Sequence, residues 1–247
     1  MSTTAESTLA DYLSGLDNLY DQKKIAAVQR LLPNRLDGLK GLDLGCGGGC
    51  LTVWMAQNGA ESWGVDLSAK RTEGARLLAE REGVADRCHF VHGDVCAVDL
   101  GVQFDVVLAK DIIEHVDESA FLHTIRRHLK PGGRVVVVTH NSISLQYALV
   151  APVYWLVKRE RYLAPDPTHL RMYTARSLNR VLRRGGLTPM QWRGTYHLPY
   201  RLLKSVVPLS LLERLQLHLI EDIFGAVWPF SATGWTLCVA CQSVPTA

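Results

Sequence analysis

Apolar residues follow two spacings along this chain, one typical of helices and one typical of strands. Residues 21–32 carry apolar side chains three and four positions apart, which predicts a helix ending before Pro33. Short apolar runs predict strands at 39–44, 62–66, 88–92, 104–109 and 134–139. Helical patterns lie between most of these strands, at 51–58, 68–83 and 119–129. Alternating strands and helices indicate α/β units with a parallel sheet that is covered on both faces.

The alternation is interrupted after residue 139 by two apolar insertions. The first, 141–157, contains no charged residue, and we expect Pro152 to break it. A helix at 175–184 and a strand at 190–196 follow. The second insertion, 197–233, contains a capping-box pattern at Ser210 that predicts a helix towards Phe224, and a last strand follows at 234–242. We therefore expect one domain over residues 1–247 with a loosely ordered polar segment at 1–20.

Composition excludes several broad classes of protein. Hydrophobic residues make up 47% and charged residues 21% of the 247 residues, which is ordinary globular usage and excludes global disorder and fibrous repeats. The six cysteines show no spacing of a disulfide framework, so we expect buried, reduced thiols. The polar, acidic N-terminus does not resemble a signal peptide, and the predicted location is the cytoplasm.

Charge is concentrated in one part of the chain. Residues 158–204 contain eleven Lys and Arg residues, opposed only by Glu160 and Asp166. Such a basic segment suits a phosphate group or an anionic membrane surface, which would make the protein peripheral to a membrane. A solvated helix face accounts for the same pattern, and both interpretations remain open.

The most informative stretch is the glycine-rich sequence at 42–49, between the first predicted strand and a helix. Its pattern is Asp43-x-Gly45-x-Gly47-x-Gly49, and glycines there allow a sharp turn and a close approach of the backbone to a ligand. A dinucleotide fingerprint would have its third glycine at position 50, where Cys50 stands instead. This difference disfavours an NAD-dependent oxidoreductase.

Polar residues end the next three predicted strands. Asp66 ends the second strand, 17 residues beyond Gly49, where a carboxylate can accept hydrogen bonds from ribose hydroxyls. Asp94 ends the third strand and can accept a bond from an adenine amino group, and Lys110 with Asp111 ends the fourth. Because ligands of such folds bind at the carboxyl edge of the sheet, these residues predict a nucleotide-type cofactor there.

Taken together, these motifs resemble the class I S-adenosylmethionine-dependent methyltransferases. The similar segments are 42–49, 65–66, 92–94, 104–107 and 129–133, and they cover roughly residues 20–140 in matching order. The resemblance implies a Rossmann-like, seven-stranded, mostly parallel sheet with helices on both faces and an antiparallel last strand. It also implies S-adenosyl-L-methionine as cofactor, bound by this half of the chain.

The resemblance assigns a role to each expected cofactor residue. Gly45 and Gly47 would pass the methionine moiety, Asp66 would hold the ribose, and Lys24 would meet the methionine carboxylate. Adenine would be met by Asp94 and Val95, and the cofactor would also contact the backbone at Lys110. The remaining members of the expected cofactor-binding set are Asp43, Gly49 and Leu67.

Within this family the chain is most similar to the ubiquinone-biosynthesis-type O-methyltransferases. Residues 111–116 stand where that subgroup has an E-x-x-E-H metal pattern, with Asp111 in place of the first Glu. The resemblance implies that Asp111, Glu114 and His115 hold Mg²⁺ or another divalent metal, and we expect them on one face of a helical turn. Alternatively, Glu114 and His115 cap a helix and pack against the cofactor loop.

We expect methyl transfer to a small hydrophobic acceptor, and O-methylation of a phenolic or prenylated substrate is the favoured reaction. A phenol needs a base or a metal for methylation at neutral pH, and His140 and His169 are the candidate bases. N- or C-methylation of a small secondary metabolite or a lipid-linked sugar remains open, and a non-catalytic binding subunit is a distant alternative. An Asn-Pro-Pro-Tyr motif is absent, so we expect no nucleic-acid partner.

The two insertions, 141–170 and 197–233, are expected to cover the substrate or to form an interface. Apolar faces beside Lys158 and Arg159 suit a helix lying at a lipid surface. A lid over the cofactor domain or a homodimer contact accounts for the same segments, so peripheral membrane contact and dimer contact both remain open.

Overall fold

The computed structural model describes residues 19–160, 162, 166, 168–197, 208, 211 and 223–243. The N-terminal segment 1–18 lies outside this part of the chain. So does most of the second insertion, including the helix expected from Ser210 to Phe224.

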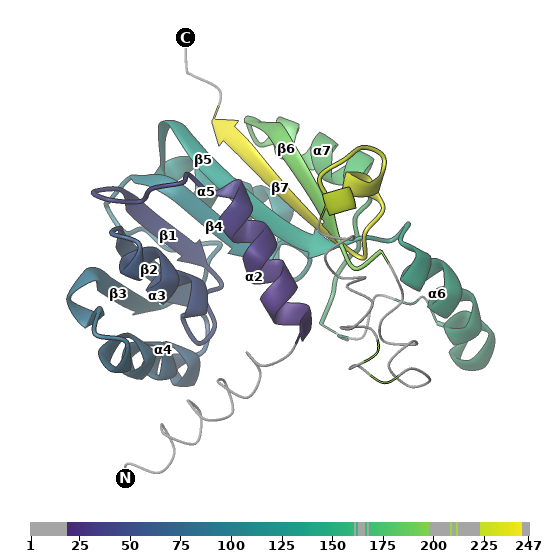
Figure 1. Ribbon diagram of the computed structural model, residues 1–247, viewed down its shortest axis with the longest axis horizontal. Helices are drawn as coiled ribbons and strands as arrows, with labels where there is room; N and C mark the ends of the chain where they lie inside the picture. Colours follow the sequence, from purple (N-terminus) through teal and green to yellow (C-terminus); the bar gives the residue numbers. More distant parts are fainter. Residues whose placement is uncertain are drawn as a thin grey trace.

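A single seven-stranded sheet organises the described residues (Figure 1). Its strands are β1 (Lys40–Leu44), β2 (Glu61–Asp66), β3 (Cys88–His92), β4 (Phe104–Lys110), β5 (Leu129–His140), β6 (Leu187–Thr195) and β7 (Thr236–Ser243). Their order across the sheet is β3-β2-β1-β4-β5-β7-β6. The pairs among β1 to β5 are parallel, whereas β7 is antiparallel to both of its neighbours. The predicted Rossmann-like fold is confirmed.

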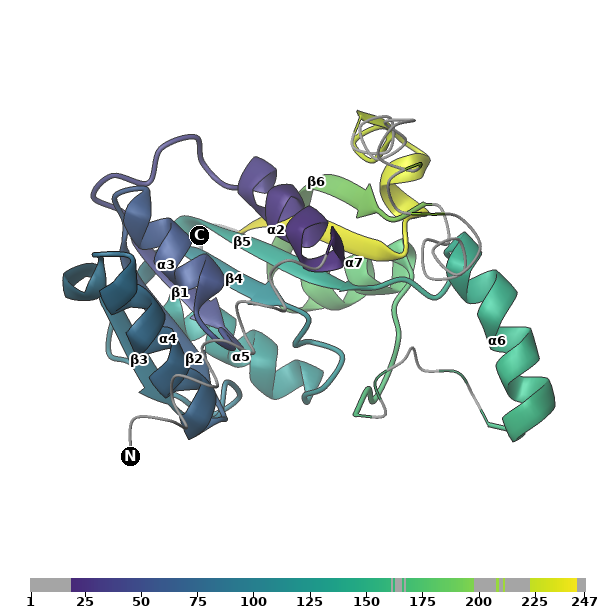
Figure 2. The same cartoon turned by 60° about the horizontal axis from the view of Figure 1, so that its bottom comes forward.

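Helices cover both faces of the sheet (Figure 2). They are α2 (Leu19–Leu31), α3 (Cys50–Gln57), α4 (Ala69–Arg81), α5 (Glu118–His128), α6 (Leu145–Lys158) and α7 (Ala175–Arg184), with short 3-10 turns at Ala85–Arg87 and Phe230–Ala232. Successive strand residues point to opposite faces. Val106 accordingly packs with α2 and α3, and Val107 packs with α5 and α7. The carboxyl ends of β1, β2, β3, β4 and β5 are left at one edge.

Strand β5 begins earlier than the sequence predicts. The sequence predicts a helix that ends at 129 and a strand that begins at 134, but β5 already starts at Leu129 and includes Pro131, Gly132 and Gly133. Phe104 of β4 pairs with Leu129, and the register then shifts so that Val106 pairs with Arg134. The residues in between form an irregularity in which Gly132 has φ 75°, a conformation that glycine adopts without strain.

Helix α6 runs through Pro152, which the sequence predicted to break this segment. Pro152 is exposed and has no N–H to donate to the carbonyl of Ala148, so the helix continues with one backbone hydrogen bond missing. Ser144 caps the helix by accepting a bond from Tyr147 N. Both views show α6 projecting away from the sheet (Figures 1 and 2).

Candidate cofactor and acceptor site

The loop between β1 and α3 is built on three glycines in the left-handed region. The φ angles of Gly45, Gly47 and Gly49 are 79°, 55° and 83°. A Cβ added to Gly49 would lie 2.7 Å from the Cβ of Ala75 in α4, whereas a Cβ added to Gly47 would meet nothing within 4 Å. Gly49 is therefore required for packing inside the protein, while Gly47 borders open space.

Asp66 at the end of β2 ties this loop to the edge of the sheet. Its Oδ2 accepts a hydrogen bond of 2.9 Å from Gly47 N, and its Oδ1 accepts one of 2.9 Å from Ser68 N. A carboxylate offers about four lone-pair positions, so each oxygen can still accept a second bond. Asp66 therefore supports the loop and retains the capacity to bind hydroxyl groups.

Asp43 lies beneath the loop rather than beside the open space. It is only 2% exposed, and its Oδ2 accepts a bond of 3.0 Å from Thr52 Oγ1 of α3. Burial raises the pKa of the Asp43 carboxyl to about 6. We conclude that Asp43 supports the loop from within the core, a role different from the ligand contact expected from its motif.

The ends of β2 and β3 bring an apolar and an acidic side chain together. Leu67 is 72% exposed, which is unusual for a leucine beside a sheet edge. Gly93 N donates to the carbonyl of Asp66, and the exposed Asp94 next to it accepts a bond from Cys96 N. Val95 is buried in the core and presents only its backbone to this edge. An apolar surface and a nearby hydrogen-bond acceptor suit the planar ring of a nucleobase.

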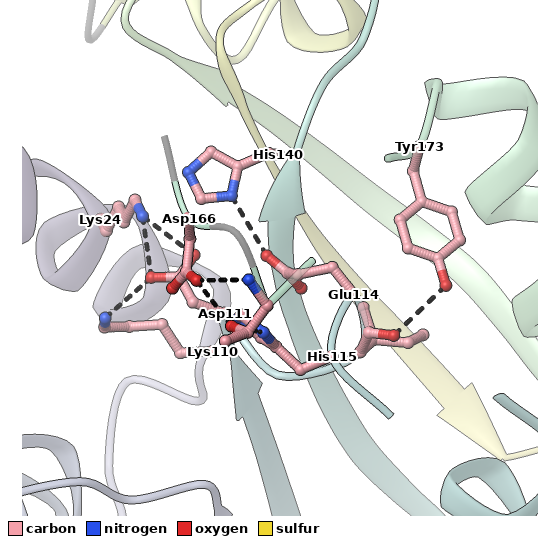
Figure 3. A network of polar contacts seen from close by, with 10 residues as sticks. Lys24, Lys110, Asp111, Glu114, His115, His140, Asp166 and Tyr173 are labelled. Carbon is pink, nitrogen blue, oxygen red and sulfur yellow. Dashed lines mark hydrogen bonds and ion pairs between the residues drawn. The ribbon is translucent and has the colours of Figure 1, made fainter. Parts of the chain in front are cut away.

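A cluster of three charges occupies the end of β4 (Figure 3). Lys24 Nζ from α2 lies 2.9 Å and 2.8 Å from the two carboxylate oxygens of Asp111, and Lys110 Nζ lies 3.0 Å from Oδ2. Burial alone would raise the pKa of the Asp111 carboxyl, but the ammonium groups of Lys110 and Lys24 outweigh it and hold the pKa well below its usual range. Two ammonium groups therefore face one carboxylate at the end of β4.

Glu114 lies at the centre of a second cluster, among histidines (Figure 3). Its side chain is buried, and its Oε1 lies 3.1 Å from Nδ1 of His140 at the end of β5. The ring of His169 lies near two other imidazoles, with centroid distances of 4.6 Å to His115 and 5.2 Å to His140. Both candidate bases and all three predicted metal ligands therefore lie at the same edge of the sheet.

The expected arrangement of the metal ligands is wrong in one respect. Residues 113–115 form a turn outside any helix, and Asp111 takes φ 53°, so the three residues do not share a helical face. Among the described residues, potential ligand atoms gather within 4.8 Å in two sets: Glu114, His115 and His169, and Asp111, Glu114 and His140. Asp111 and His115 belong to different sets.

Sequence reasoning missed a chain of hydrogen bonds behind His115. Thr168 Oγ1 donates to Asp166 Oδ1 and lies 2.9 Å from Nδ1 of His115. The spacing of Asp166 and Thr168, two residues apart, is the spacing of a local Asp-capped turn, and Thr168 N does donate to Asp166 Oδ1. That pattern could have indicated the turn, but not its contact with His115.

The fold and the site define the class of Rossmann-like α/β proteins that bind a nucleotide-type ligand at a glycine loop. A family model described as a methyltransferase domain matches residues 17–191. The chain belongs to this methyltransferase family, and the family predicted from the sequence is confirmed.

Individual relatives agree with the family assignment. The chain is 36% identical over 166 residues to a ubiquinone biosynthesis O-methyltransferase of Cereibacter sphaeroides, a match that covers 66% of this chain and 65% of that protein. It is similar in fold to the magnesium protoporphyrin IX methyltransferase of Synechocystis with bound SAH (TM-score 0.62, 16% identity, 90% and 83% of the two chains). It is also similar to the 1,6-didemethyltoxoflavin-N1-methyltransferase of Burkholderia thailandensis with bound S-adenosylhomocysteine (TM-score 0.60, 19% identity, 97% and 87%).

Proposed function

We propose that this protein transfers the methyl group of S-adenosylmethionine to an oxygen atom of a small hydrophobic acceptor, a phenol or a prenylated phenol. The observation that carries this proposal is that Gly47, with open space in front of it, and Asp66 and Asp94 lie at the same carboxyl edge of the sheet as a cluster of histidines. The similarity to an enzyme named for ubiquinone O-methylation supports oxygen as the accepting atom.

Each part of the cofactor has a matching group at the carboxyl edge. The ribose hydroxyls would donate to Asp66, and the adenine would lie against Leu67 with its amino group near Asp94 and the backbone of Val95. The methionine moiety would pass Gly45 and Gly47 towards Lys24 and Lys110. The ammonium groups of Lys24 and Lys110 would donate hydrogen bonds to the methionine carboxylate.

The acceptor side of the site is aromatic. The ring of Trp235 lies 5.2 Å from the ring of His140 and belongs to a buried cluster with Tyr162 and Tyr196. Side chains of α6, Tyr147 and Tyr154 among them, pack against this cluster. Rings of this kind favour an apolar, aromatic acceptor over a sugar, because they offer few hydrogen-bond partners.

His140 would act as the base. Glu114 Oε1 accepts from Nδ1–H of His140, which leaves the lone pair on Nε2. Nε2 would take the proton of the acceptor hydroxyl as the oxygen attacks the methyl carbon. A C–O bond then forms, the C–S bond breaks, and S-adenosylhomocysteine leaves with the electron pair on sulfur. Glu114 keeps the imidazole oriented and stabilises its protonated form.

The metal ligands expected from the sequence do not fit a cation as a set. Both oxygens of Asp111 already accept bonds from Lys24, and Lys110 adds a second positive charge beside it. A divalent ion at Asp111 would have to displace an ammonium group and face another one. The steps above therefore involve no metal at Asp111.

A comparison of acceptors tests this function. The protein would be incubated with methyl-labelled S-adenosylmethionine and a catechol, either bare or carrying a prenyl chain, and products identified by mass spectrometry. We expect methylation of both, with a higher kcat/KM for the prenylated acceptor. Aniline analogues of the same acceptors would be tested in parallel, and methylation of the amines alone would replace O-methylation with N-methylation.

Two glycine substitutions should separate packing from cofactor binding. Gly49→Ala adds a Cβ 2.7 Å from Ala75, so we expect a loss of about 3 kcal/mol in the free energy of unfolding. Gly47→Ala meets no protein atom and should cost only about 1 kcal/mol through its left-handed backbone. The methyl group added by Gly47→Ala points into the space assigned to the cofactor, so this variant should bind S-adenosylhomocysteine about fivefold more weakly. Chemical unfolding and calorimetry measure both quantities; equal effects of the two variants on stability would contradict the assignment.

Helix α6 supports a peripheral contact with a lipid surface. One side packs on the aromatic cluster, while Leu149, Val153, Trp155 and Leu156 on the remaining surface are exposed. The helix ends at Lys158, and the guanidinium of Arg159 lies 5.1 Å from the Trp155 ring. An apolar surface bordered by cations suits an anionic bilayer, from which a prenylated acceptor could be collected.

Among the described residues, no helix combines the length and apolar character needed to cross a bilayer.

Flotation with anionic vesicles should separate a membrane contact of α6 from a lid or a dimer contact. We expect salt-sensitive flotation of the wild type, and at least about a fivefold loss in binding for Trp155→Ser combined with Lys158→Glu. Lys70→Glu on α4, an exposed position far from α6, is the charge-matched control and should float normally (Figure 1). A wild-type protein that stays in the soluble fraction at low salt would exclude the membrane contact, and a dimer in sedimentation would then assign the surface to a second copy.

A further inference from the structure

The buried carboxylate of Glu114 has one oxygen that the protein itself does not satisfy. Glu114 Oε1 is paired with His140, but Oε2 is buried and has no hydrogen-bond partner in the described part of the chain. The side chain is only 1% exposed. Leaving a charged acceptor buried without a partner is costly, so this oxygen points to a missing cation or donor.

His115 can offer a nitrogen lone pair in the same cluster as Glu114. The hydroxyl proton of Thr168 goes to Asp166, so Thr168 Oγ1 accepts from Nδ1–H of His115. The lone pair of His115 is therefore on Nε2. Histidines that bind metals in proteins are commonly oriented by an acceptor at their other ring nitrogen, and here the Thr168 hydroxyl, itself held by the Asp166 carboxylate, takes that place.

His169 completes the set. It is 4% exposed, and its ring centroid lies 4.6 Å from that of His115. One potential ligand atom each from Glu114, His115 and His169 lies within 4.8 Å of the others. A single ion can bind three atoms at this separation, since metal–ligand bonds of about 2.0–2.2 Å place ligand atoms up to about 4 Å apart. A small side-chain adjustment then suffices.

The second set of nearby ligand atoms, Asp111, Glu114 and His140, is less suited to a cation. The carboxylate of Asp111 is already neutralised by Lys24 and Lys110. His140 directs Nδ1 at Glu114 Oε1, so these two atoms are used by each other. Glu114, whose Oε2 is the unsatisfied atom, belongs to both sets, and only the first set combines it with two imidazoles.

We infer that Glu114, His115 and His169 form a site for a borderline divalent ion such as Zn²⁺, and that Asp111 is not one of its ligands. One carboxylate and two imidazoles suit Zn²⁺ and its first-row neighbours, whereas Mg²⁺ prefers oxygen ligands alone. Three protein ligands leave a coordination position open. This inference rests on the proposed function in one respect: a metal bound there would lower the pKa of an acceptor hydroxyl.

Metal binding can be measured independently of any assay of methyl transfer. Wild-type protein stripped with a chelator would be titrated with Zn²⁺ and Mg²⁺ by calorimetry, and with Co²⁺ by visible absorption, which reports imidazole ligation. We expect one equivalent of Zn²⁺ to bind and Mg²⁺ to bind far more weakly. His169→Gln should weaken Zn²⁺ binding by at least about 100-fold, and Thr168→Val, which removes only the orienting hydroxyl, by about 10- to 100-fold.

Two matched variants make the experiment decisive. Asp111→Asn should keep the Zn²⁺ affinity of the wild type, and His123→Gln on the exposed side of α5 controls for surface histidines. Loss of binding in Asp111→Asn with retention in His169→Gln would overturn the inference, as would absence of Zn²⁺ and Co²⁺ binding to the wild type. Binding of S-adenosylhomocysteine by the same preparations reports folding and the proposed function separately, so either proposal can fail without the other.

Discussion

Replacing Asp66 with alanine is expected to weaken the binding of S-adenosylhomocysteine by at least about tenfold. The carboxylate would accept two bonds from the ribose, and a hydrogen bond to a charged group contributes about 1.5–3 kcal/mol. Since about 1.4 kcal/mol corresponds to a tenfold change in affinity, the loss of one bond suffices for this effect. The substitution also removes the acceptor for Gly47 N, which loosens the loop that the methionine moiety passes.

Titration calorimetry of the wild type, Asp66→Ala and Asp94→Ala would measure this effect. Asp94 would accept a single bond from adenine and is exposed, so its loss should cost less than the loss of Asp66. NAD serves as the competing ligand. Unchanged affinity in Asp66→Ala would contradict the placement of the ribose, and preferential binding of NAD would contradict the assigned cofactor.

Replacing His140 with glutamine is expected to lower kcat by about 10²- to 10⁴-fold, the usual contribution of a general base. Glutamine retains a donor for Glu114 Oε1 but cannot take the proton of the acceptor. The affinity for S-adenosylhomocysteine should be unchanged, because no cofactor contact is assigned to His140. Steady-state kinetics with a phenolic acceptor gives kcat, and calorimetry gives the affinity.

His123→Gln provides the matched control for this substitution. His123 lies on the exposed side of α5, so this variant should keep the kcat of the wild type. A His140→Gln enzyme with the kcat of the wild type would exclude His140 as the base. A large fall in cofactor affinity in the same variant would instead place His140 at the cofactor.

The fold and the cofactor loop could be predicted from the sequence because their signals are local. Gly45, Gly47 and Gly49 stand at positions where the backbone takes a positive φ, a requirement that selects glycine from the loop conformation alone. The acids that end β2 and β3 follow directly from the strand pattern. The boundary of β5 was missed because pairing with β4 carries the strand through Pro131 and Gly132, an effect of tertiary structure.

The arrangement of the acceptor side could not be predicted, because it depends on contacts between distant residues. Lys24 and Asp111 are 87 residues apart, and their ion pair changes Asp111 from an expected metal ligand into a partner of two lysines. Glu114 and His140 are 26 residues apart and meet only because β4 and β5 are neighbours. The helical turn expected at 111–115 failed because Asp111 adopts φ 53°.

The most direct test of methyl transfer to oxygen is to follow the methyl carbon itself. The protein would be mixed with S-adenosylmethionine carrying a ¹³C-labelled methyl group and a prenylated catechol, and carbon NMR spectra recorded as the reaction proceeds. We expect the sulfonium methyl resonance to decline while a methoxy resonance appears, with an equal amount of unlabelled S-adenosylhomocysteine measured by chromatography. The methoxy signal should be absent in His140→Gln over the same time. A label that appears on carbon or nitrogen, or that stays on sulfur although the cofactor is bound, would contradict the proposed function.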